Sequence, residues 1–203
     1  MPKLSTDLNK TRVVRTAGRT TRPAADEQGE RLSERVTYPY PPPHSLGRCW
    51  PWESLPQTVN IERVAHHEAG HAVIGEWLGL PGIRATAEPS KGLMKHGLDF
   101  GALPAPGPDE DGRLAGTAAS LFLGGFAAEL IWAGRPWAGP VHCPAQADFQ
   151  NAEAMLAPRF GRLSSAGHGY ATRVALSVLS ESWPRVQEIA AILAKHGEWK
   201  AAG

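Results

Sequence analysis

The chain of 203 residues is long enough for one domain with a substantial core, and its formal net charge is only +1. A chain so nearly neutral lacks the electrostatic character of a nucleic-acid-binding protein. Two cysteines cannot build a disulfide framework, which favours a reducing compartment and makes the cytoplasm the default location. We expect no membrane span, because no apolar run approaches the ~20 uninterrupted residues that cross a bilayer. The N-terminus also lacks the hydrophobic centre of a secretory signal.

Residues 1–56 are predicted to form a disordered arm rather than a domain. They contain few large apolar residues and many basic or small polar ones, so they bury too little surface to offset the entropy of ordering the chain. A proline-rich stretch at residues 38–43 precedes Trp50 and Trp52. A solvated tail is the simplest interpretation. A segment that binds a regulatory partner or a separate ATPase stays open, as does an organelle address in a eukaryotic source.

Residues 64–80 are predicted to be a helix, because their apolar residues recur at helical spacing. Within this helix, His67, Glu68 and His71 form an H-E-x-x-H motif. Residues four apart share one face of a helix, so both imidazoles can bind one zinc ion. Glu68 is then placed to take a proton from a zinc-bound water. The alternative is a chance match with two metal-free histidines, against which the helical, apolar setting counts.

Two short strands are expected after this helix, at residues 83–88 and 97–103. The turn between them contains Lys91, Lys95 and His96, for which solvent exposure is the default. The strands are expected to pair as a small sheet beside the metal-binding helix. In zinc peptidases such a strand commonly offers its edge to an extended substrate.

A second helix is predicted at residues 113–134. Gly124 and Gly125 interrupt it at about 1 kcal/mol each relative to alanine, which indicates a close approach to another helix. The expected neighbour is the face of the first helix that carries Gly70. Glu129, the only acid in this segment, has two interpretations. It is either a boundary residue facing water or a carboxylate that receives the free N–H of a zinc-bound imidazole.

The segment LGGFAAELIWAG, followed after a short loop by ADFQNAEAML, resembles the peptidase domain of the FtsH-type ATP-dependent zinc metalloproteases. In that family an HEAGH helix precedes an L-G-G-x-x-A-E-E helix and a T-G-A-x-x-D-L segment. The similarity covers about residues 60–198, including an apolar stripe in the closing helices. It implies that Asp148 is the third zinc ligand with His67 and His71, that Glu68 is the catalytic base, and that Glu129 matches the first acid after the double glycine.

Two features depart from the family pattern. The chain has no room for the ATPase domain or the membrane helices, so we expect ATP-independent cleavage of segments that are already unfolded or flexible. The loop HCPAQA stands where the family has Thr-Gly-Ala, and Pro144 restricts its backbone. Cys143 or His142 therefore remains open as a replacement for Asp148, since thiolate and imidazole also bind zinc.

The sequence thus predicts a mainly α-helical zinc-peptidase domain at residues 57–203, with a small β-sheet beside the active-site helix. The expected function is a zinc metalloendopeptidase acting on a protein or peptide substrate. Two alternatives stay open, a non-catalytic binding module on a protease-derived fold and a protease specialised for one regulator delivered by the arm. The intact Glu68 favours catalysis over a pure binder, which requires no general base.

Overall fold

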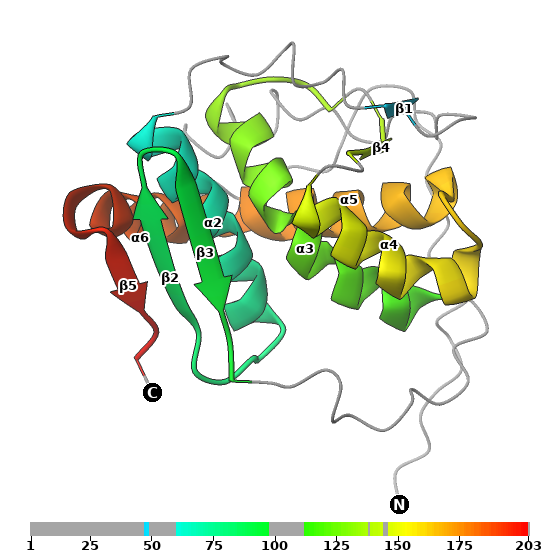
Figure 1. Cartoon of the computed structure of the whole chain (residues 1–203), viewed down its shortest axis with the longest axis horizontal. Helices are drawn as coiled ribbons and strands as arrows, with labels where there is room; N and C mark the ends of the chain where they lie inside the picture. The colour runs from blue at the N-terminus through cyan, green and yellow to red at the C-terminus, as the bar shows by residue number, and fades with distance from the viewer. Residues whose placement is uncertain (1–46, 49–59, 98–111, 138, 144–145, 203) are drawn as a thin grey trace, which may run out of the picture.

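The computed structural model of the chain describes residues 47–48, 60–97, 112–137, 139–143 and 146–202. Of the predicted arm, only Gly47–Arg48 is described, so the prediction of disorder lies outside these residues. The described part is mainly helical with a small antiparallel sheet, as the sequence predicted (Figure 1). The helices are α2 (Ile61–Trp77), α3 (Arg113–Trp132), α4 (Ala147–Phe160), α5 (Ser165–Glu181) and α6 (Trp183–His196).

Helix α2 begins at Ile61, earlier than the predicted start at residue 64, and Asn60 is its N-cap. The Asn60 side chain accepts the backbone N–H of Arg63 at 2.9 Å, which satisfies one of the free donors of the first turn. Glu62 lies in the same turn, where a negative charge favours the helix dipole. The helix ends at Trp77, and Gly79 follows in the left-handed region with φ 71°.

Helices α2 and α3 approach each other through glycine backbones, as the double glycine predicted. A Cβ on Gly70 would lie 2.5 Å from the carbonyl oxygen of Gly124 and 2.6 Å from the Cβ of Ala128. A Cβ on Gly125 would lie 2.4 Å from Nε2 of His67. The glycines therefore bring α3 against the face of α2 that carries Gly70 and His67.

The sheet lies against α2 and differs in part from the expected one (Figure 1). Its first strand, β2 (Arg84–Glu88), is at the predicted place. The assignment of residues 91–95 to a turn was wrong, because they form strand β3 (Lys91–Lys95), which pairs with β2 in place of the expected partner. Glu88 pairs with Lys91, so only two residues form the hairpin loop. Of the segment 97–103, Gly97 lies outside β3 and the rest lies outside the described residues.

A third strand, β5 (Glu198–Lys200), was not predicted and pairs antiparallel with the other side of β2. The strand order is β3-β2-β5, which leaves β3 at an edge of the sheet. Elsewhere, β1 (Gly47–Arg48) pairs parallel with β4 (Val141–His142). Among the described strands, none pairs with the outer edge of β3, and such an edge can pair with another extended backbone.

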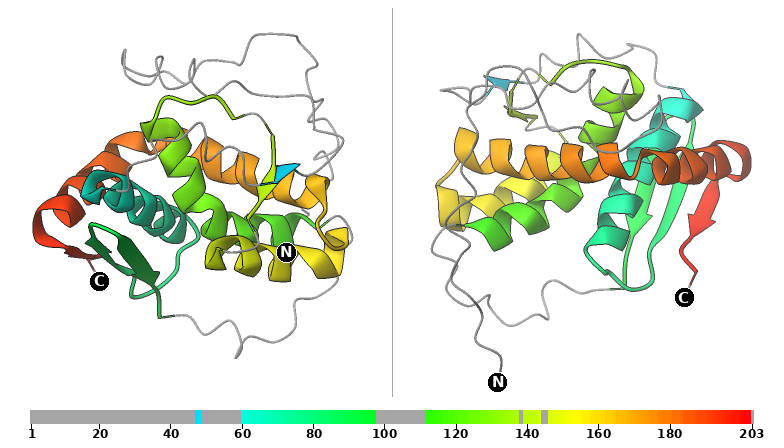
Figure 2. Two further views of the ribbon diagram at one scale, coloured as in Figure 1. Left: turned by 45° about the horizontal axis from the view of Figure 1, so that its top comes forward. Right: turned by 180° about the vertical axis from the view of Figure 1, so that it is seen from behind.

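Helices α5 and α6 pass behind α2 and α3 and close the core (Figure 2). The predicted apolar stripe is buried at Leu179, Val186, Ile189 and Leu193, with Val174 partly buried. Helix α3 is long and apolar enough to cross a bilayer by length and composition, yet 72% of its apolar window is buried inside the fold. Core helices of soluble proteins share this composition, so α3 is weak evidence for a membrane span.

The substitution Gly70→Ala tests the close approach of α2 and α3. The added methyl group meets backbone on α3, so we expect a loss of about 1–3 kcal/mol in the free energy of unfolding despite the better helix propensity of alanine. The control is Gly169→Ala in α5, whose Cβ would lie 3.6 Å or more from its neighbours and should be neutral or slightly stabilising. Denaturant unfolding measures both. Equal stabilities for the two variants would contradict the packing argument.

Candidate metal centre

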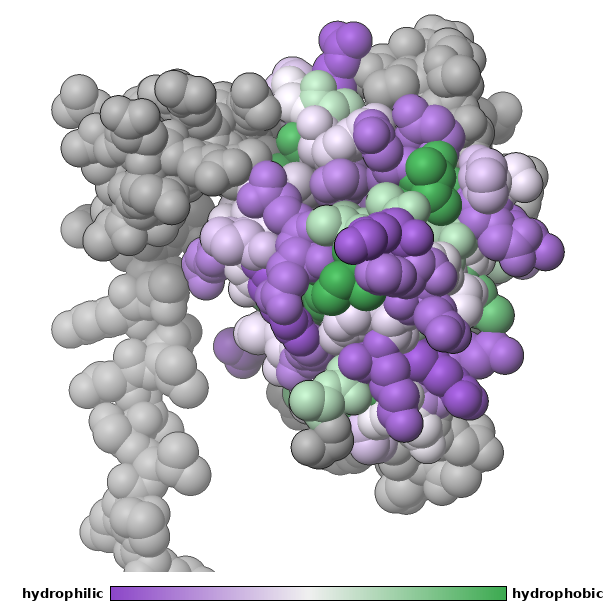
Figure 3. Space-filling view, turned by 90° about the vertical axis from the view of Figure 1, so that its left-hand side faces the viewer, coloured by the Kyte–Doolittle hydropathy of each residue, from purple (hydrophilic) through white to green (hydrophobic). Residues whose placement is uncertain are grey.

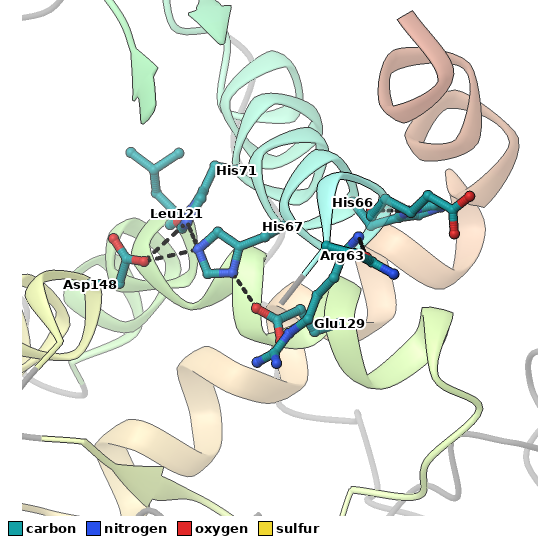
Figure 4. Close-up of polar contacts among 9 residues, drawn as sticks. Arg63, His66, His67, His71, Leu121, Glu129 and Asp148 are labelled. Atoms are coloured by element: carbon teal, nitrogen blue, oxygen red, sulfur yellow. Dashed lines mark hydrogen bonds and ion pairs between the residues drawn. The ribbon is translucent and has the colours of Figure 1, made fainter. Parts of the chain in front are cut away.

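Three ligand-type side chains converge beside α2 (Figure 4). The Nε2 atoms of His67 and His71 lie 3.0 Å apart. Oδ2 of Asp148, in the first turn of α4, lies 3.1 Å from Nε2 of His67 and 3.3 Å from Nε2 of His71. Tetrahedral zinc bound at about 2.0–2.1 Å separates its ligand atoms by about 3.3 Å. These two imidazoles and one carboxylate therefore have the chemistry and the spacing of a zinc site.

The other nitrogen of each imidazole is held by α3. Nδ1 of His67 lies 2.7 Å from Oε1 of Glu129, and Nδ1 of His71 lies 2.7 Å from the carbonyl oxygen of Leu121. Both partners accept hydrogen bonds, so each Nδ1 carries the proton and each Nε2 is left to bind a metal. The contacts with Glu129 and Leu121 thus set both the ring orientation and the tautomer.

Glu129 does not face water. It is 4% exposed, and its Oε2 accepts a hydrogen bond from Nε of Arg63 at 2.7 Å. The boundary interpretation is therefore wrong for this side chain, and Glu129 makes the contact with His67 that the alternative required. Its role toward a bound metal stays a prediction. Arg63 was not singled out from the sequence, although it lies one helical turn before His67.

The metal-free site attracts protons. Burial lowers the pKa of His67, but hydrogen bonds with Asp148 and Glu129 outweigh burial and raise that pKa to about 10. Burial raises the pKa of Asp148, but the facing imidazoles outweigh it and hold that pKa well below its usual range. The site therefore stabilises positive charge between the two helices, which is a property that a metal cation also uses.

Glu68 points into the same cleft. It is 5% exposed, and burial raises its pKa even though His71 and His67 act in the opposite direction. Gly92 of β3 makes room for it, because a Cβ there would lie 2.5 Å from Oε1 of Glu68. A carboxylate with a raised pKa beside a metal site has the character of a general base.

The cleft has a volume of about 780 Å³ and is bounded by α2, α3, α4 and the edge strand β3. Strand β3 contributes Lys91, Gly92, Leu93 and Met94 to its lining. On β3, the Leu93 side chain is 51% exposed. Figure 3 shows the opposite side of the sheet, at β5 and α6, where the surface is largely hydrophilic with small hydrophobic areas. Strand β3 therefore borders the cleft and also has an edge that pairs with no other described strand.

The alternative third ligands lie elsewhere. Cys143 is 1% exposed, and in the described part of the chain the group around His67 and His71 is completed by Asp148 alone. His142 belongs to a separate group with Glu153 and His168. The structure therefore brings together the ligand set that the family resemblance implied.

A scan against protein-family models finds no matching family, and a search of curated proteins finds no match. The resemblance to FtsH-type peptidases accordingly rests on the motifs and stays a prediction. The positions and contacts of His67, Glu68, His71 and Asp148 are therefore the observations that bear on function.

Zinc affinity is expected to depend steeply on pH. A protonated imidazole cannot bind metal, and His67 stays protonated up to a pKa of about 10 in the metal-free protein. Burial lowers the pKa of His71, but Asp148 outweighs burial, so that pKa is raised as well. The apparent association constant should therefore rise by at least about tenfold per pH unit between pH 6.5 and 8.5, whereas it would level off above pH 7 for histidines of ordinary pKa. Competition with a chromophoric chelator measures it.

The matched variant for this measurement is Glu129→Gln. It removes one of the carboxylates that raise the pKa of His67, so the pH dependence should level off at lower pH. A natural protein whose affinity is already constant above pH 7.5 would contradict the raised pKa.

Proposed function

We propose that the chain is a zinc-dependent metalloendopeptidase. The observation that carries this proposal is the convergence of His67, His71 and Asp148 on one point of a cleft that Glu68 also lines. Two histidines and one carboxylate are three protein ligands, the number typical of a catalytic zinc site with an open position. A structural site usually has four protein ligands and needs neither a cleft nor a buried base.

The chemistry divides between the metal and Glu68. Zinc, when bound, supplies a Lewis acid that lowers the pKa of water and polarises a peptide carbonyl. The Glu68 carboxylate takes a proton from the attacking water as the oxygen–carbon bond forms. It returns that proton to the amine nitrogen as the carbon–nitrogen bond breaks. The raised pKa of Glu68 suits both the uptake and the return of this proton, because the pKa of the carboxylate is then closer to the pH at which the reaction takes place.

The substrate class follows from the edge of the sheet. Strand β3 borders the cleft and has no neighbour on its outer side among the described strands. An extended peptide can add to such an edge by main-chain hydrogen bonds, with little dependence on its sequence. Only a segment that is not already paired within its own fold can do so. We therefore propose unfolded or flexible protein segments as substrates.

The substitution Glu68→Gln separates binding from catalysis. The amide cannot accept the proton of water, so we expect kcat on an unfolded model protein to fall by about 10²–10⁴-fold while the zinc content stays that of the natural chain. His71→Gln should lose both activity and one zinc per chain. The control is Glu62→Gln, which changes an exposed carboxylate in the first turn of the same helix and should leave kcat unchanged.

Two results would refute the proposal. Cleavage by the Glu68→Gln variant at the natural rate would remove Glu68 as the base. Zinc binding without cleavage of unfolded or extended substrates by the natural chain would instead indicate a binding module or a protease specialised for one partner.

The substitution Gly92→Ala should displace Glu68 without unfolding the protein. The new methyl group would overlap the end of a flexible side chain rather than backbone, so the carboxylate can move aside at little cost in stability. We expect kcat to fall by about tenfold or more with KM and zinc content little changed, because a small displacement of a catalytic group is costly. Lys95→Ala, at an exposed position of the same strand, is the control. Full activity in Gly92→Ala would show that Glu68 does not need its present position.

A further inference from the structure

A second group of metal-ligand side chains lies away from the cleft. It consists of His142 at the end of β4, Glu153 on α4 and His168 on α5, and is called the His142 cluster below. One ligand atom from each residue lies within 4.8 Å of the other two. Glu153 lies five positions after Asp148 on α4. This spacing places the two residues about 7.5 Å apart along the helix axis and about 140° apart around it. The two groups therefore use different faces of the same helix.

The Glu153 carboxylate is oriented by the backbone. Its Oε1 accepts the N–H of Leu163 at 2.8 Å, which leaves Oε2 facing Nε2 of His168 at 2.9 Å. Leu163 has φ 51°, and among the described residues it is the one non-glycine with positive φ. Such a conformation is strained for a residue with a side chain and persists where its surroundings impose it. The turn thus fixes one carboxylate oxygen and directs the other at the imidazole.

The contact between Glu153 and His168 lies largely out of water. The His168 side chain is fully buried, and the Glu153 side chain is 16% exposed. A carboxylate in such a place is stabilised by a positively charged partner.

The His142 cluster resembles the group of His67, His71 and Asp148 in its ring geometry and in one carboxylate–imidazole distance. The ring centroids of His142 and His168 lie 5.5 Å apart, and the angle between the ring planes is 74°. The corresponding values for His67 and His71 are 4.8 Å and 71°. The distance from Glu153 Oε2 to His168 Nε2 is 2.9 Å, and the distance from Asp148 Oδ2 to His67 Nε2 is 3.1 Å. A hydrogen bond between Glu153 and His168 alone would need neither a second imidazole at this place nor a strained turn behind the carboxylate.

We propose that His142, Glu153 and His168 form a second metal site, for a divalent first-row transition cation such as Zn²⁺. Imidazole and carboxylate ligands suit zinc rather than calcium or magnesium, which prefer oxygen ligands alone. The ion would join β4, α4 and α5. Because α4 also carries Asp148, the second ion would hold in place the helix that supplies the third ligand of the cleft.

The experiment counts zinc in proteins whose cleft site has been removed, so it does not depend on peptidase activity. Zinc per chain is measured by elemental mass spectrometry after dialysis. We expect two in the natural chain, one in His67→Gln/Asp148→Ala, one in His142→Gln, and none in the combined variant. A natural chain with one zinc and a His67→Gln/Asp148→Ala variant with none would overturn the second site.

A second experiment measures the change in Tm on addition of zinc. It tests the second site also in variants that lose zinc during dialysis or are less stable than the natural chain. In the His67→Gln/Asp148→Ala protein, zinc at 100-fold its dissociation constant should raise Tm by about 5–10 °C. Adding His142→Gln or, independently, Glu153→Gln should abolish this shift. His196→Gln, at an exposed position near the end of α6, should retain it. A shift that persists unchanged in both cluster variants would place the ion elsewhere and refute the proposal.

Discussion

The close backbone contact between α2 and α3 is the constraint on which the candidate catalytic site depends. Gly70 and Gly124 let the two helices approach until a methyl group no longer fits between them. At that separation the Glu129 carboxylate and the Leu121 carbonyl oxygen reach the two imidazoles at 2.7 Å. A wider spacing would leave both Nδ1 atoms without partners and both rings free to rotate. Helix packing therefore fixes the orientation and tautomer of the histidines.

The negative charge of the side chains around the two histidines favours the binding of a cation. The carboxylates of Glu68, Glu129 and Asp148 surround two imidazoles that bind metal only when neutral. Arg63 balances one of these charges through its ion pair with Glu129. The remaining negative charge, largely removed from water, requires compensation. Protons supply it in the metal-free protein, which is why the pKa of His67 is raised, and a divalent cation can replace them.

The parts of the fold that depend on residues close together in the sequence could be predicted from the sequence. The capped helix with its H-E-x-x-H motif and the glycine contact follow from side-chain spacing and backbone propensity. A small sheet beside α2 and its strand β2 were predicted correctly. Strands β3 and β5 were missed, because they are short segments whose strand conformation depends on pairing with β2. Arg63 was readable as a neighbour one turn before His67, whereas the Leu121 carbonyl carries no side-chain signal. The His142 cluster has no spacing pattern, since only tertiary packing brings its three elements together.

The third ligand of the cleft is placed by packing rather than by capping. Helix α4 begins without a side-chain cap, and an uncapped first turn is prone to fraying. Asp148 lies in that turn, but its neighbour Phe149 is 1% exposed and packs edge-on against Phe126 of α3 at 5.6 Å. The carboxylate is thus held by the same helix that orients the imidazoles. A displacement of α4 relative to α3 would move Asp148 away from the two imidazole nitrogens, which belong to α2 and would not move with it. The geometry of the candidate metal site therefore depends on the contact between α4 and α3.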